Sequence, residues 1–278
     1  MAAPVEHSTR GVRVGPGPFP WVAMYHSVHE SRDDPYRITV TPDRLAAQFR
    51  WLRRHGLRGV SLADLLAARA QGAGRGLVGL TFDDGYADFV DHALPLLRRF
   101  GFGATLFVLP GRLGGDNAWD PLGPRKPLLT ADGVRRAAAA AGVEIGSHGL
   151  THVDLTRADE ATLHAETAAS RALLTEVTGR EVRGFCYPYG AVDDRAVAAV
   201  RGAGYSYACA IDPGALTGPH ALPRVHVGQR DTAVRLYLKH RLHRLRRRPL
   251  APGAASRTSG ASAASTPGAP ASGREGAR

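Results

Sequence analysis

The sequence predicts an α/β protein, a (β/α) barrel of seven to eight parallel strands. Short apolar segments alternate with amphipathic segments seven or eight times along the chain, as strands and covering helices do in a parallel sheet. The length of 278 residues is sufficient for one such barrel. Several apolar segments also end in polar residues, and the working residues of these barrels lie where strands end.

The first half of the chain contains the clearest helix signal. Thr41 is a typical N-cap, Pro42 suits the first helical position, and Leu45, Phe49 and Leu52 recur at helical spacing. We expect strands at residues 21–26, 58–60, 77–80 and 104–109. We expect helices at residues 41–55, 62–70 and 88–100.

The second half continues the same alternation. Thr130 is placed to cap its first helix. The expected strands are residues 143–146, 184–187, 205–210 and 222–227. The expected helices are residues 130–141, 158–178 and 192–202, followed by a basic helix that ends near residue 248.

Composition divides the chain into three parts. Residues 1–19 are rich in glycine and proline and are predicted to form a flexible arm, and residues 20–248 form the barrel. Residues 249–278 consist mainly of alanine, serine, glycine and proline. Because almost no large apolar side chain is present there to offset the entropy of ordering, we predict a disordered tail.

The formal charge of +11 would suit a polyanionic partner. However, Lys126 and Lys239 are the only lysines, and the arginines accompany an excess of alanine and glycine. This bias indicates a compositional habit, so we predict no specific nucleic-acid partner. The helix at 235–248 carries leucines among its arginines, and a peripheral contact with an anionic surface is the alternative. The oligomeric state is not predicted.

The cytoplasm is the expected compartment. The first twenty residues contain no apolar stretch typical of a signal peptide, and no apolar run is long enough to span a membrane. Cys186 and Cys209 lie in apolar, strand-like segments without metal-site spacing between them. We predict that both are buried thiols.

Asp83 and Asp84 directly follow the apolar segment at 77–80. Adjacent side chains on a strand point to opposite faces, but a bend at Gly85 can bring both carboxylates to one mouth. There they repel each other unless a cation or a shared proton compensates. We therefore expect one carboxylate to bind a metal while its neighbour moves protons. A solvated Asp-Asp-Gly turn is the alternative for this stretch by itself.

His148 and His152 lie four residues apart just after the strand at 143–146. A helical turn after Gly149 would let both rings face one point, where Asp84 completes a His-His-carboxylate set. This set suits Zn²⁺ first, with Co²⁺ or Fe²⁺ as alternatives. Such a metal activates water for hydrolysis, and Asp83 is placed to take the proton from that water. The turn at 187–190 could offer a backbone N–H, that of Tyr189, to an oxyanion, and a tight Pro-Gly turn with a purely structural role is the alternative.

Three segments in this order resemble the polysaccharide deacetylases of carbohydrate esterase family 4, which share the NodB-homology domain. They are residues 81–86, 147–152 and 187–190. The resemblance covers about residues 20–228 and implies a distorted (β/α) barrel. It implies that Asp83 is the general base and that Asp84, His148 and His152 are the metal ligands. Members of the family remove acetyl groups from N-acetylated sugars, or sometimes O-acetyl groups, by metal-assisted hydrolysis.

Two departures are similar to the branch that contains poly-N-acetylglucosamine deacetylases. Residues 185–187 replace an arginine-led motif, and the last strand reads Leu-Pro-Arg-Val-His at 222–226 instead of Leu-x-His. In that branch the strand order is circularly permuted and a histidine on the first strand is thought to be the general acid. The resemblance thus implies His26 as the acid and Arg224 as the cation that keeps Asp83 ionised. His226 is the rival acid.

We therefore expect a metal-dependent hydrolase whose partner is an N-acetylated carbohydrate. One alternative keeps the chemistry but changes the substrate, as in an amidase or deacetylase that tailors a small molecule or a glycolipid. The other alternative is a basic, non-catalytic binding module that uses the arginine-rich helix.

Overall fold

The computed structural model describes residues 19–31 and 33–246. The predicted tail at 249–278 lies outside the described residues, as does the predicted arm apart from Phe19, which is buried. The described helices include none that is long and apolar enough to cross a membrane.

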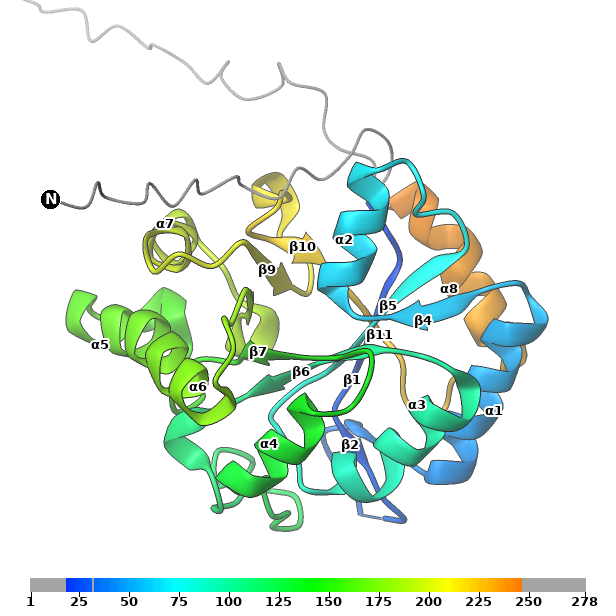
Figure 1. Cartoon of the computed structure of the whole chain (residues 1–278), viewed down its shortest axis with the longest axis horizontal. Helices are drawn as coiled ribbons and strands as arrows, with labels where there is room; N and C mark the ends of the chain where they lie inside the picture. Colours follow the sequence, from blue (N-terminus) through cyan, green and yellow to red (C-terminus); the bar gives the residue numbers. More distant parts are fainter. Residues whose placement is uncertain (1–18, 32, 247–278) are drawn as a thin grey trace, which may run out of the picture.

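Within the described residues, a single parallel sheet forms a nearly closed barrel (Figure 1). The order along the sheet is β10-β9-β8-β7-β6-β5-β1-β11, and β4 pairs with the first half of β5. The strands are β1 (Val22–Tyr25), β4 (Arg58–Val60), β5 (Leu77–Phe82), β6 (Ala104–Val108), β7 (Val143–Ser147), β8 (Gly184–Cys186), β9 (Tyr207–Ala210), β10 (Leu222–Pro223) and β11 (Val225–His226). The predicted parallel (β/α) barrel is confirmed.

The barrel closes at the last strand, which the sequence predicts as one element and the structure divides into two. β10 pairs with β9, whereas β11 pairs with β1, and Arg224 lies between them. Pro223 has no N–H to continue the ladder with β9, so the chain passes from one neighbour to the other at this point. A separate pair of short parallel strands, β2 (Ser27–Val28) and β3 (Thr39–Val40), follows β1.

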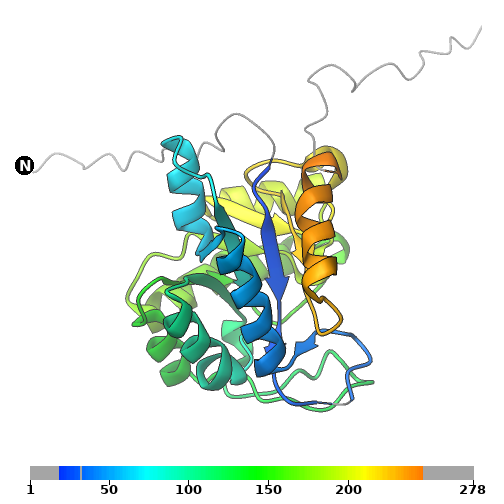
Figure 2. The same cartoon turned by 90° about the vertical axis from the view of Figure 1, so that its right-hand side faces the viewer.

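Helices cover the outside of the barrel, and Figure 2 shows α8 beside β1 and α1. They are α1 (Pro42–Arg54), α2 (Leu62–Ala70), α3 (Leu94–Phe100), α4 (Ala131–Ala138), α5 (Glu160–His164), α6 (Ser170–Thr178), α7 (Asp194–Gly202) and α8 (Ala233–Arg246). The predicted caps are confirmed, since the hydroxyl oxygens of Thr41 and Thr130 accept from the N–H groups of Arg44 and Gly133.

Two predicted helices contain a wider turn of the π type. One spans Phe89–Ala93 before α3, and the other spans Ala165–Ala169 between α5 and α6. Such turns insert a residue into the helix and often occur at functional sites. The second one redirects the side chains that lie behind the segment containing His148 and His152.

The core has two parts. The larger part lies between the barrel and its helices, whereas the smaller part includes Val22, Phe107, Cys186 and Leu222 from four different strands. These strand residues share contacts with the leucines of α2, and the first turn of α2 bonds to Thr105 and Glu144. We infer that the smaller cluster fills the barrel interior and that α2 closes its N-terminal end.

All strands run in the same direction, so their C-terminal ends meet at one mouth. The residues that follow or terminate β1, β5, β7, β8 and β10 there are His26, Asp83, Asp84, His148, Tyr187 and Arg224. The fold thus gathers the predicted residues from distant parts of the sequence.

Gly184 provides a test of the packing between β8 and β9. A Cβ at this position would lie 2.3 Å from the Tyr207 hydroxyl oxygen, so we expect Gly184→Ala to lower the free energy of unfolding by about 1–3 kcal/mol. Gly202 in α7 is the control, because a Cβ there meets nothing within 4 Å and alanine favours helix by about 0.5 kcal/mol. Urea denaturation measures both, and a Gly184→Ala protein as stable as the parent would contradict the prediction.

Candidate functional site

Asp83 and Asp84 follow β5 and reach the same mouth, as the sequence predicts. Asp84 has φ 69° and Gly85 has φ 71°, so the chain bends sharply immediately after Asp83. Both carboxylates are almost fully buried and line one cavity of about 300 Å³. Because of this bend, Asp83 and Asp84 contact different partners, so the two adjacent carboxylates can have different roles.

Asp84, His148 and His152 converge, and all three are buried. Asp84 Oδ1 lies 3.2 Å from His148 Nε2 and 3.3 Å from His152 Nε2. One ligand atom of each residue lies within 4.8 Å of the others. The structure therefore brings together the three side chains that the sequence nominates as metal ligands.

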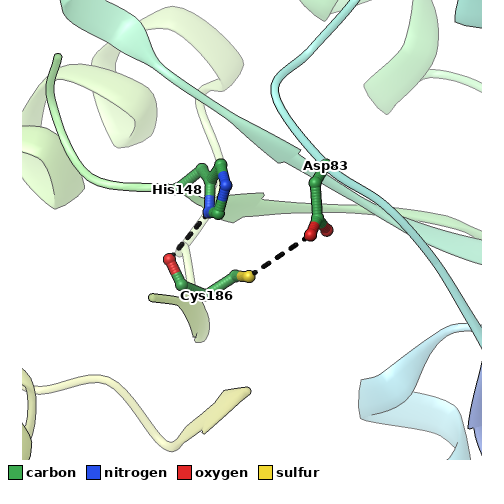
Figure 3. Close-up of side chains that lie close together, drawn as sticks. All are labelled: Asp83, His148 and Cys186. Atoms are coloured by element: carbon green, nitrogen blue, oxygen red, sulfur yellow. Dashed lines mark hydrogen bonds between the residues drawn. The ribbon is translucent and has the colours of Figure 1, made fainter. Parts of the chain in front are cut away.

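The chemistry of this donor set suits a cation. His148 Nδ1 lies 2.8 Å from the carbonyl oxygen of Cys186 and must carry a proton to donate to it (Figure 3). His148 Nε2 is then the nitrogen that faces Asp84, and in the neutral imidazole its lone pair would oppose a carboxylate oxygen. A divalent ion between them removes this repulsion. A histidine ligand commonly donates its other N–H to a carbonyl in this way.

Glu166 holds the loop that joins the two histidines and is absent from the residues that the sequence nominates. Its carboxylate accepts from the N–H of Leu150, at 2.6 Å, and from both the N–H and the hydroxyl of Thr151. Ser170 adds a bond from its hydroxyl to the carbonyl oxygen of Gly149, at 2.8 Å. Both side chains lie at the π turn of the 160–178 helix. An acidic residue on the apolar face of that helix is the signal that identifies Glu166.

Arg224 pairs with Asp83 inside the barrel. Its Nη1 lies 2.7 Å from Asp83 Oδ1 and 3.1 Å from the Thr81 hydroxyl, and its Nε donates to the carbonyl oxygen of Ala210. Burial raises the pKa of Asp83, but the charge of Arg224 and its hydrogen bond outweigh burial and leave that pKa lowered. Asp83 is therefore ionised and able to accept a proton.

Cys186 lies on the other side of the same carboxylate. Its Sγ is 3.7 Å from Asp83 Oδ2, and Figure 3 shows Cys186 between Asp83 and His148. Burial raises the pKa of this thiol well above its ordinary value, so it is a neutral donor. Cys186 and Cys209 are both buried and free, as predicted.

His26 and His226 differ in their surroundings. His26 Nε2 lies 3.9 Å from Asp83 Oδ2, and His26 lines the same cavity as the two carboxylates. His226 does not line that cavity, and the centre of its ring is 6.4 Å from that of His26. Burial lowers the pKa of both imidazoles.

Tyr189 and Trp119 form an aromatic rim. The ring of Trp119 stacks on His152 at 4.4 Å between centroids, and the half-exposed Tyr189 ring meets His152 edge-on at 4.6 Å. Trp119 lies in the loop between β6 and α4 and is absent from the residues that the sequence nominates. An aromatic residue in a long glycine-rich loop is the available signal.

Backbone strain is concentrated at this site. Among the residues that the structure describes, four non-glycine positions have positive φ, and three of them, Asp84, His152 and Tyr189, line the 300 Å³ cavity. Side chains in this region cost about 1 kcal/mol or more, and such residues cluster where function requires a fixed geometry. The strain is thus an independent mark of a functional site.

Comparisons with known proteins identify the family of this chain. The family model for polysaccharide deacetylase matches residues 70–208, which is half of the chain. YxkH of Bacillus subtilis (strain 168) is 26% identical over 225 residues, covering 78% of this chain and 75% of that protein. The poly-beta-1,6-N-acetyl-D-glucosamine N-deacetylase of Staphylococcus aureus (strain N315) is 24% identical over 200 residues, covering 67% of each chain.

Solved structures share the fold. The Streptococcus pyogenes deacetylase PplD has a TM-score of 0.68 and 22% identity, covering 80% of this chain and 98% of that one. IcaB from Ammonifex degensii has a TM-score of 0.62 and 24% identity, covering 80% and 97%. From the family match together with this fold, we conclude that the chain belongs to the polysaccharide deacetylase family of hydrolases.

Proposed function

We propose that this protein removes acetyl groups from an N-acetylated sugar or polysaccharide by metal-assisted hydrolysis. The observation that carries the proposal is the convergence of Asp84, His148 and His152 beside a separate, ionised Asp83. The Staphylococcus aureus relative is named as an N-deacetylase of an N-acetylated glucosamine polymer, which supports this substrate class.

Asp84, His148 and His152 would hold the metal, with Zn²⁺ as the first choice and Co²⁺ or Fe²⁺ as alternatives. When bound, such an ion polarises the acetamide carbonyl and makes water a better nucleophile at neutral pH. Glu166 and the Cys186 carbonyl fix the loop and the His148 ring, so the ligand atoms need little rearrangement on binding.

Asp83 acts as the general base and takes a proton from the attacking water. Arg224 keeps it ionised without competing for Oδ2, because the guanidinium binds Oδ1. The N–H of Tyr189 is proposed to stabilise the oxyanion of the tetrahedral intermediate, at the strained turn after β8. His26, which lies 3.9 Å from Asp83 Oδ2 and lines the same cavity, is proposed to donate a proton to the leaving amine.

Removal of the base gives the most direct test. We expect Asp83→Asn to reduce kcat for acetate release from N-acetylglucosamine oligomers by about 10²–10⁴-fold, since the amide cannot accept the proton. Zinc content, measured by elemental analysis, should stay equal to that of the parent, because Asp83 is not a ligand. Asp84→Asn is the matched comparison and should lower both zinc content and activity. Full activity in Asp83→Asn would overturn the role of this residue.

The general acid is tested by a pair of variants. His26 lines the catalytic cavity and His226 does not, so we expect His26→Ala to lower kcat by at least about 10²-fold and His226→Ala to change it far less. Acetate release under saturating substrate measures both. The reverse order of effects would transfer the role to His226.

The pH profile tests Arg224. In the parent, the arginine holds the pKa of Asp83 below its ordinary value, so the base stays charged as the pH falls. Arg224→Gln removes the largest contribution that opposes burial and so raises the pKa of Asp83, and the acidic limb of kcat/KM should move to higher pH. Arg224→Lys keeps a positive charge and should move the acidic limb less. An acidic limb at the same pH in all three proteins would show that Arg224 does not control the base.

A further inference from the structure

A larger groove of about 800 Å³ adjoins the catalytic cavity. It lies between the β2–β3 segment, the segment after β10 and helix α8. Ile211 and Arg224 line both the groove and the cavity. A substrate whose acetylated sugar occupies the cavity can therefore extend its remaining part into the groove.

Three exposed arginines line this groove, namely Arg37, Arg230 and Arg235. None of them forms an ion pair with another residue in the described part of the chain. Lys239 differs, since its ammonium group bonds to Asp231 at 2.7 Å and to the carbonyl oxygen of His226 at 2.6 Å. The guanidinium groups thus remain available to a ligand, whereas the ammonium is already occupied.

The acidic residues of the groove do not balance these charges. Asp34 accepts from the N–H groups of Ile38 and Thr39, and Asp231 is engaged by Lys239 and by the N–H of Gly228. Asp212 is the remaining carboxylate of the lining. The groove consequently presents an excess of positive charge beside the site of reaction.

The positive charge of the groove affects which substrates it can bind. Each deacetylation converts a neutral acetamide into an amine that is protonated at neutral pH, so a polymer of glucosamine becomes increasingly cationic. A groove with three unpaired guanidinium groups repels such a product. Guanidinium groups instead bind phosphate through paired, charge-assisted hydrogen bonds. Leu238 and Leu242 of α8 lie on the same face as Arg235 and Lys239 and leave room for an apolar portion next to the anion.

We propose that the groove binds a phosphate group on the aglycone, so that the preferred substrate is an N-acetylhexosamine joined to a phosphate and not a neutral glycan. This inference rests on the proposed deacetylase activity and specifies its substrate class. Arg230 and Arg235 are the specificity-determining residues, and they act on KM because they contact the aglycone and not the reacting amide.

Three matched substrates test the proposal with the full chain loaded with zinc. They are methyl N-acetylglucosaminide, N-acetylglucosaminyl methyl phosphate and N-acetylglucosaminyl dodecyl phosphate. We expect the kcat/KM of both phosphodiesters to exceed that of the neutral glycoside by about tenfold or more, through KM. A higher kcat/KM for the dodecyl phosphodiester than for the methyl phosphodiester would identify a lipid-linked source of the phosphate. Equal kcat/KM for the two phosphodiesters would identify a soluble source. Equal kcat/KM for all three would overturn the proposal.

Variants that remove charge test whether Arg230 and Arg235 cause the preference for phosphodiester substrates. In Arg230→Gln/Arg235→Gln, the ratio of kcat/KM between phosphodiester and neutral substrate should fall about tenfold and lose its dependence on salt. Arg241→Gln is the control, because Arg241 is exposed on α8 but packs over Tyr237 outside the groove, and it should keep the ratio. An unchanged ratio in the double variant would overturn the assignment to these arginines.

Calorimetric binding separates this proposal from the proposed function. N-acetylglucosamine 1-phosphate should bind the parent more tightly than methyl N-acetylglucosaminide, and the double variant should lose that difference. Acetate release without a phosphate preference would refute only the proposal that the groove binds phosphate. Absence of acetate release from every substrate, with a binding preference for phosphate retained, would refute the deacetylase and leave the anion site supported.

Discussion

The buried ion pair between Arg224 and Asp83 is the interaction on which the rest of the structure depends. Arg224 lies between β10 and β11, at the point where the chain passes from β9 to β1 and closes the barrel. Asp83 directly follows β5, on the far side of β1. Because a buried charge that loses its partner costs about 3–5 kcal/mol, barrel closure and an ionised Asp83 require each other. The same contact therefore serves the fold and, under the proposed function, the general base.

A second constraint gives two adjacent carboxylates different roles. Asp83 continues the direction of β5 and faces Arg224, whereas Asp84 turns through a positive φ toward His148 and His152. Without this turn both side chains would compete for one environment and repel each other. The cost of the strained backbone is offset by the tightly bonded surroundings, which leave the chain no other path.

The sequence predicts most of the fold and the centre of the site, because both depend on local patterns. Alternating apolar segments indicate the strands, and polar residues at their ends indicate the mouth. Glu166 and Trp119 could not be placed, since a π turn in one helix and the path of a long loop bring them to the site. The division of the last strand at Arg224 likewise depends on the spacing of its two neighbours, which no local pattern records.

Cys186 occupies the place where the resemblance implies an arginine-led motif. Its thiol approaches Oδ2 of Asp83 from β8, while Arg224 approaches Oδ1 from the seam of the barrel. A second guanidinium on β8 would place two like charges against one buried carboxylate, with no counter-ion for the extra one. A neutral, weakly donating thiol fills that space without adding charge. Asp83 thus has a buried guanidinium, that of Arg224, at Oδ1 and a neutral thiol at Oδ2.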